Sequence, residues 1–210
     1  MGLRTPLLLL SALMIVLTVL VSVRWVTANK IEQANQRQFI NTMEELIQVP
    51  NQALRFDNDP YTDTITVMAS QLNPDKPVQL HRLRNQSTTV ALLVNSVAPD
   101  GYNGDIKLLV AVHTDGSLLG VRILEHRETP GLGDKVEADR SPWIRQFNQA
   151  SLKSIAESGW TVRKYGGEFD HITGATITTR AVVQAVHRVL LWYAENRTIA
   201  FDTLSGTHLE

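Results

Sequence analysis

Four threonines crowd one short stretch near the end of the chain, Asp170-His171-Ile172-Thr173-Gly174-Ala175-Thr176-Ile177-Thr178-Thr179. An apolar segment with helical periodicity follows, so the stretch is expected to lead into a helix. Gly174 permits a tight backbone path, and a helix start has several N–H groups without intrahelical partners. Such a start binds anions, phosphate above all, and a threonine hydroxyl there is suited to carry a phosphate ester. By spacing alone, a threonine-rich turn with a helix cap is the simpler interpretation.

A second group of polar residues, Glu125, His126 and Glu128, has the residue types of a metal site. The spacing matches no established ligand pattern such as H-E-x-x-H, and an ion-paired strand end explains the group more simply. We therefore predict no metal site. The acidic residues that follow are interpreted as a solvated charge run: Asp134, Glu137 and Asp139.

Composition limits the chemistry further. The chain has 210 residues, with 20 Lys+Arg against 21 Asp+Glu for a net charge of −1, which gives no electrostatic case for nucleic-acid binding. It has no cysteine, which excludes disulfides, thiolate metal sites and cysteine nucleophiles. Any redox chemistry must come from a bound organic cofactor, or from a metal held by histidine and carboxylates.

An uncharged run lies between Arg4 and Arg24. As a helix it would span about 28 Å at about 1.5 Å per residue, close to the thickness of the hydrocarbon core of a bilayer. The competing interpretation is a signal peptide cleaved near Ala28, but the run is long for one and Arg24 is unusual there. We expect an uncleaved transmembrane anchor over residues 1–27. The flanking charges leave its orientation open.

Periodicity predicts the remaining elements. Residues 28–60 read as a helical stalk and linker, with a helix from Ile31 that Pro50 ends. Residues 61–200 read as one soluble domain, followed by a tail over 201–210. Antiparallel strands are predicted within the domain, which favours an α+β fold with flanking helices. Their expected ranges are 64–68, 78–84, 88–97, 106–113 and 118–124, with an Asp115-Gly116 hairpin between the last two.

The second half of the domain has weaker signals. Ser141-Pro142 is expected to open a short helix through Phe147, and Trp160–Arg163 is expected to be a short strand. A long helix from about Thr179 to Asn196 closes the domain. His187 is expected on its polar, solvated face. Three tryptophans are expected in the core rather than stacked on a ligand: Trp143, Trp160 and Trp192.

The stretch from Asp170 to Thr176 resembles the flavinylation motif Asp-x-x-(Ser/Thr)-Gly-Ala-Thr of the FMN-binding domain family. Three further segments resemble other blocks of that family in order and spacing: Gly101–Gly104, Asp115-Gly116 and Glu125–Gly133. With the N-terminal run and the chain length, the sequence is similar to the G subunits of Rnf (Rsx) ion-translocating electron-transport complexes. This resemblance covers essentially the whole chain.

The resemblance implies that FMN is esterified through its phosphate to Thr176, by a flavin transferase that takes it from FAD. It also implies that the transferase reads, or the turn requires, Asp170, Thr173, Gly174 and Ala175. The loop formed by Thr129, Pro130, Gly131, Leu132 and Gly133 would approach the flavin ring, with Leu132 as an apolar surface. Without the resemblance, this loop reads as a plain turn fixed by Pro130.

As a member of that family, the chain would relay electrons among other membrane subunits, with its domain on the periplasmic side of the bacterial inner membrane. It would have no substrate turnover of its own, because the flavin performs the redox chemistry. Two alternatives stay open. One is the C subunit of a sodium-translocating NADH:quinone reductase, and the other is an anchored scaffold domain without flavin.

Overall fold

A computed structural model describes residues 4–49 and 52–209 of the chain, in two compact units, Met1–Met43 and Glu44–Glu210. Helix α1, Arg4–Ile47, is continuous and accounts for both the uncharged run and the helix predicted from Ile31. Pro50, expected to end that helix, lies outside the described residues. Among the helices that are described, none is both long enough and apolar enough to cross a membrane.

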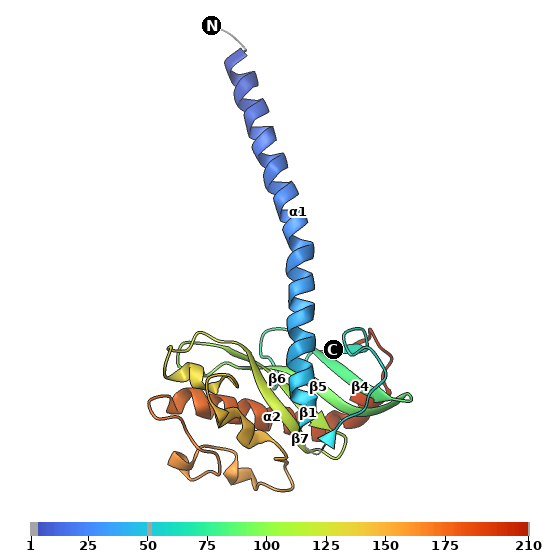
Figure 1. Cartoon of the computed structure of the whole chain (residues 1–210), viewed down its shortest axis with the longest axis vertical. Helices are drawn as coiled ribbons and strands as arrows, with labels where there is room; N and C mark the ends of the chain where they lie inside the picture. Colours follow the sequence, from blue (N-terminus) through green and yellow to red (C-terminus); the bar gives the residue numbers. More distant parts are fainter. Residues whose placement is uncertain (1–3, 50–51, 210) are drawn as a thin grey trace. The chain divides into compact units, whose positions relative to one another are not determined.

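The second unit is built on a six-stranded sheet (Figure 1). Its strands are β3 Thr64–Val67, β4 Val78–Asn85, β5 Thr88–Ala98, β6 Ile106–His113, β7 Leu118–Glu125 and β8 His208–Leu209. The order across the sheet is β7-β6-β5-β4-β3-β8: the strands from β3 to β7 pair as an antiparallel meander, and β8 joins the β3 edge in parallel. A separate two-stranded ribbon joins β1, Gln48–Val49, to β2, Gln52–Ala53. The five strands predicted in the meander are confirmed to within a residue, and β8 was not foreseen.

The long helix α2, Thr176–Asp202, packs on β5 and β6 and covers one face of the sheet. Its apolar side chains, including Val182, Val186 and Val189, are fully buried in the main core. The three tryptophans predicted for the core are buried, which confirms their structural role. His187 differs from its prediction, because it is half-buried and stacks on Trp160 with the ring centroids 5.1 Å apart. Burial lowers the pKa of this imidazole.

The last turn of α1 belongs to the second unit and lies on β7. Leu46 is fully buried there because Gly120 has no side chain: a Cβ at position 120 would lie 2.9 Å from Leu46 Cδ2. Arg122 faces Glu45, with 3.6 Å between Nε and Oε2. This turn therefore packs on the sheet through a close backbone approach at Gly120.

Four short 3₁₀ helices connect β7 to α2, and they hold the loops around the threonine-rich stretch. Their bounds are η1 Gly133–Val136, η2 Pro142–Phe147, η3 Glu157–Gly159 and η4 Arg163–Tyr165. The predicted cap of η2 is confirmed: Ser141 Oγ accepts a hydrogen bond from the Trp143 N–H at 3.2 Å. The strand predicted at Trp160–Arg163 is wrong. This segment forms turns with one isolated bridge, Val162 to Phe169, because its backbone groups bond within the loop.

A fully buried arginine ties the end of the chain to the sheet. Arg82 on β4 donates from Nε to Asp63 Oδ1 at 2.8 Å and from Nη2 to Ser205 Oγ at 2.7 Å, and also bonds the Thr203 carbonyl. Arg84 adds a second bond to Asp63 at 2.8 Å. The segment after α2 is thereby joined to β3 and β4 instead of forming a detached tail.

Candidate functional site

Helix α2 begins at Thr176, three residues earlier than expected, so Thr176 is its first residue. The preceding Ala175 provides no side-chain cap. Gly174 has φ +85°, a left-handed conformation that disfavours residues with a side chain. The turn at Gly174 leads directly into α2, whose first N–H groups have no partners within the helix, an arrangement that suits an anion.

The four threonine hydroxyls have different surroundings. Thr178 is buried and donates to Glu128 Oε2 at 2.5 Å, and Thr179 is buried and donates to the Ala175 carbonyl at 3.0 Å. Thr173 is exposed and Thr176 half-buried. Within the described part of the chain, neither of these last two hydroxyls has a hydrogen-bond partner. Two of the four threonines are thus free to react.

The loop Thr129–Gly133 lies against the turn that precedes α2. The Thr129 carbonyl accepts hydrogen bonds from the N–H groups of Leu132 and Gly133 at 3.1 and 3.0 Å, and Gly131 has φ +78°. Leu132 is 42% exposed, and its Cδ2 would lie 3.0 Å from a Cβ at Gly174. The structure thus brings together two segments that are about 40 residues apart and that the sequence had singled out separately.

Between these segments lies a pocket of about 640 Å³. Six of the predicted site residues line it: Thr129, Leu132, Gly133, Gly174, Ala175 and Thr176. Four others, Asp170, Pro130, Gly131 and Thr173, do not. Six lining residues were not predicted as contacts: Tyr102, Glu128, Lys164, Tyr165, Ile177 and Thr178.

Two tyrosines in the pocket lining present aromatic surface to solvent. Tyr102 is 65% exposed and Tyr165 is 53% exposed. The Arg180 guanidinium lies 5.5 Å from the centre of the Tyr165 ring, in cation–π range. Lys164 adds a positive charge to the lining. The pocket therefore combines flat and apolar surfaces with a cation and a helix start.

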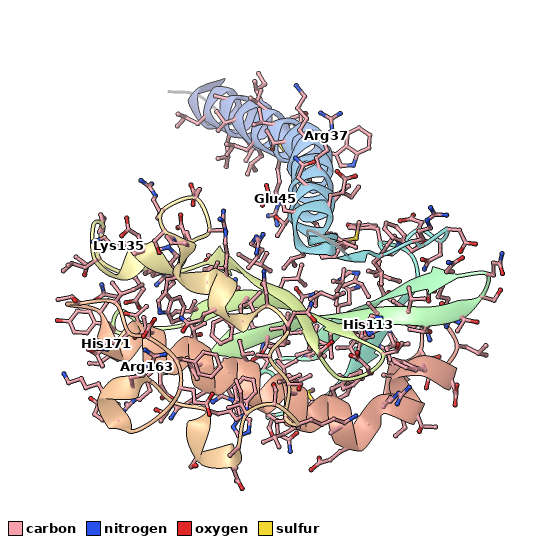
Figure 2. All side chains as sticks on the ribbon, turned by 60° about the horizontal axis from the view of Figure 1, so that its bottom comes forward. Arg37, Glu45, His113, Lys135, Arg163 and His171 are labelled. Carbon is pink, nitrogen blue, oxygen red and sulfur yellow. The ribbon has the colours of Figure 1, made fainter. Side chains whose placement is uncertain are left out.

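Asp170, the first residue of the threonine-rich stretch, is held by its backbone. Its N–H donates to Gln146 Oε1 at 2.8 Å, and its carbonyl accepts from Trp143 Nε1 at 2.6 Å. Its carboxylate remains exposed and pairs with Arg163 at 3.1 Å. Figure 2 shows Arg163 and the adjacent His171 on the same side of the second unit. The Asp170 carboxylate is thus open to a partner molecule.

His126 is occupied by contacts inside the protein. Its Nδ1 accepts the Glu128 N–H at 3.0 Å, so the proton is on Nε2, which lies 2.5 Å from Glu137 Oε1. Asp134 and Glu137 are half-buried and only Asp139 is exposed, so the interpretation of this stretch as a solvated charge run is wrong for the first two residues. Among the described residues, no group of three histidine or acidic side chains has metal-binding geometry.

A family model described as FMN-binding domain matches residues 101–191, a range that contains every residue lining the pocket. The chain is also similar to proteins named as the G subunit of an ion-translocating oxidoreductase complex. The Pseudomonas aeruginosa protein is 45% identical over 145 residues, covering 68% of this chain and 67% of that protein. The Shewanella amazonensis protein is 39% identical over 201 residues, covering 95% and 92%. The Vibrio cholerae protein is 39% identical over 165 residues, covering 78% and 77%.

Proposed function

Because the chain belongs to the family of G subunits of ion-translocating oxidoreductase complexes, we propose that it is a flavoprotein that relays electrons through FMN esterified to Thr176. One observation carries the choice of residue. Of the four threonines, Thr176 alone lines the pocket with a hydroxyl that, among the described residues, has no hydrogen-bond partner. Thr178 and Thr179 use their hydroxyls inside the fold, and Thr173 does not line the pocket.

The pocket volume and the types of the lining residues fit FMN. The pocket volume, about 640 Å³, is in the range of small-molecule sites. Leu132, Tyr102 and Tyr165 offer surfaces for a flat ring system. Lys164 and the N–H groups at the start of α2 suit the charge of a phosphate diester. The residues present therefore suit both ends of the cofactor.

Attachment would be a phosphoryl transfer in which no electrons change hands. The Thr176 oxygen would form a bond to the phosphorus of the FMN half of FAD, and the pyrophosphate bond would break. AMP would leave, and the hydroxyl proton would be lost to the transferase or to solvent. We propose that the transferase recognises the exposed Asp170 carboxylate together with the turn at Gly174. The mature protein would then need no acid, base or nucleophile of its own.

The tether explains how such a subunit would work. Bound FMN would supply the electron-transfer chemistry, and the protein would set its position and its access to solvent. A carrier that passes electrons between fixed neighbours must not exchange its cofactor, and an ester to Thr176 prevents this exchange. We therefore propose that the chain acts within a complex of the Rnf type, without substrate turnover of its own.

We also propose that the N-terminal helix anchors the chain in the bacterial inner membrane. The uncharged run between Arg4 and Arg24 supports this anchor, as do the exposed apolar side chains along it, among them Leu10, Ile15 and Leu20. The periplasmic side for the second unit is carried over from the family resemblance. Reporter fusions to the C-terminus, active only in the periplasm or only in the cytoplasm, test this orientation.

The attachment is tested by producing the full chain with its flavin transferase and examining a denaturing gel for flavin fluorescence. The wild-type band is expected to fluoresce, with an intact-mass gain of one FMN minus water. Thr176→Val is expected to be dark, whereas Thr176→Ser keeps a hydroxyl and is expected to fluoresce. Thr173→Ser is the matched control, because the motif accepts serine or threonine at this position, and it is expected to fluoresce.

The outcomes separate the alternatives. A dark wild-type band would contradict covalent FMN and favour the anchored scaffold domain. A fluorescent Thr176→Val would move the ester to another threonine of the stretch, such as Thr173. Copurification from the native membrane distinguishes an Rnf-type complex from a sodium-translocating NADH:quinone reductase by the subunits that accompany the chain.

A further inference from the structure

We infer that Glu128 is a positioning residue, which fixes the first turn of α2 against the opposite wall of the pocket and so places Thr176 for flavin attachment. The inference rests on the proposed attachment at Thr176. Nothing in the sequence marked Glu128 for this role, because it reads there as one charge among several at a strand end.

Both oxygens of this carboxylate bond to distant segments. Oε1 accepts the Asn103 N–H at 3.0 Å, from the loop between β5 and β6, and Oε2 accepts the Thr178 hydroxyl at 2.5 Å, from α2. The Glu128 side chain is only 5% exposed. A buried carboxylate is costly unless it is hydrogen-bonded, so these two bonds fix its place firmly.

Two glycines show how closely the pocket walls pack around it. A Cβ at Gly101 would lie 2.9 Å from Glu128 Oε1, and a Cβ at Gly133 would lie 2.7 Å from Glu128 Cβ. The backbone of both loops therefore lies directly on the Glu128 side chain. Since His126 Nδ1 accepts the Glu128 N–H, the main chain of this residue is held as well.

The bond to Thr178 transmits this placement to the attachment site. Thr178 is two residues beyond Thr176 in the same helical turn, so fixing its hydroxyl fixes that turn and the N–H groups in it. Leu132 and Thr129 follow Glu128 in the chain and line the same pocket. The Glu128 side chain thus sets the distance between the two pocket walls, and FMN would lie between them.

Two measurements on the full-length chain in detergent test the inference. The first is hydrogen exchange of residues 176–179 in the protein without flavin, and the second is the initial rate of attachment with transferase and FAD. Thr178→Val and Glu128→Ala are expected to speed the exchange and to slow attachment at least about tenfold, because a small displacement of a reacting group is costly. Thr178→Val replaces only a hydroxyl by a methyl group, so it tests the inference even if Glu128→Ala fails to fold.

Glu128→Gln is the conservative variant. Its amide oxygen can accept the Asn103 N–H while its NH₂ donates to Thr178 Oγ, so attachment is expected to stay within about threefold of wild type. Glu125→Gln is the matched control: this exposed carboxylate on the same strand end pairs with Lys107 at 2.6 Å, and its loss is expected to leave both measurements unchanged. Melting temperatures confirm that each compared variant is folded.

The results separate this inference from the proposed function. If the wild type never gains flavin, the attachment proposal fails, while faster exchange in Thr178→Val would still show that the bond fixes the turn. If the wild type is flavinylated and folded Thr178→Val gains flavin at the wild-type rate, the inference is overturned and the attachment proposal stands. A Glu128→Gln chain as slow as Glu128→Ala would also overturn it, because charge and not positioning would then be responsible.

Discussion

Leu132 lies over Gly174, so close that a Cβ on residue 174 would be 3.0 Å from Leu132 Cδ2. This contact joins the loop after β7 to the turn before α2, which are the two sides of the pocket. Gly174 is needed there for two reasons: its φ of +85° disfavours a side chain, and Leu132 occupies the space that a side chain would fill.

Gly174→Ala is therefore expected to lose about 1–2 kcal/mol of stability in denaturant unfolding, the cost of a left-handed conformation for alanine. It is also expected to slow flavin attachment, because Leu132 must shift. Gly116→Ala is the matched control, since Gly116 has φ +88° in a hairpin and a new Cβ there would lie 3.9 Å from Tyr193 Cε1, an ordinary contact. It should lose similar stability and gain flavin normally. Equal attachment rates in both variants would contradict a role for the contact.

Lys164 is the cation of the pocket lining. Lys164→Met is expected to slow attachment about threefold at low salt and less at high salt, because salt screens an exposed charge. The measurement is the initial rate of flavinylation at the two ionic strengths. Lys153→Met removes a cation away from this pocket and is expected to have no effect. If the attachment rate of Lys164→Met is reduced by the same factor at low and high salt, Lys164 does not act through its charge.

Arg82 is expected to matter for stability and not for chemistry. Arg82→Met removes a fully buried partner of Asp63 and leaves the Thr203 carbonyl and Ser205 without this donor, so it should cost about 3 kcal/mol in urea unfolding. Lys107→Met breaks the exposed pair with Glu125 and should cost about 0.5 kcal/mol or less. If Arg82→Met and Lys107→Met lose similar amounts of unfolding free energy, burial of the ion pair does not determine how much its loss destabilises the protein.

Acid stability is expected to depend on Asp63. Burial raises the pKa of this carboxyl, but hydrogen bonds from Ser205 and Arg82, with the charges of Arg82 and Arg84, lower it below its ordinary value of 3.8. Its contribution is therefore present above pH 3.8 and is lost as the pH falls through the lowered pKa.

Asp63→Asn should consequently be less stable than the wild type at neutral pH and should lose less stability on acidification. The free energy of unfolding measured across the acid range checks this. Asp75→Asn, at an exposed position between β3 and β4, should follow the wild-type curve. If the free energy of unfolding falls with pH equally in Asp63→Asn and in the wild type, Asp63 does not account for the loss of stability in acid.

The meander was predictable because its signals are local. Alternating β-branched residues and turn pairs such as Asp115-Gly116 specify strands and hairpins over a few residues. β8 has only two residues and no pattern, and it forms only because β3 provides an edge. The stacking of His187 on Trp160 also could not be read from helical periodicity, since the partner comes from a loop.

The same distinction between local and long-range signals holds for the residues of the candidate site. The resemblance to the FMN-binding domain family indicated Thr176, Gly174 and the loop near Leu132, and the structure brings them to one pocket. Glu128 was missed because its partners, Asn103 and Thr178, lie 25 and 50 residues away in the chain. Tyr165, which also lines the pocket, was not predicted as a contact, because spacing carries no information about which loop faces a pocket.

The pairing of β8 with β3 bears on how the protein is handled. Without His208 and Leu209, the β3 edge would expose unpaired N–H and C=O groups, the feature through which strands of different molecules join. Loss of the preceding residues would also leave the buried Arg82 without two of its acceptors, Thr203 and Ser205. Shortening the chain at this end is therefore expected to promote aggregation, although the lost residues lie outside the pocket proposed to hold FMN.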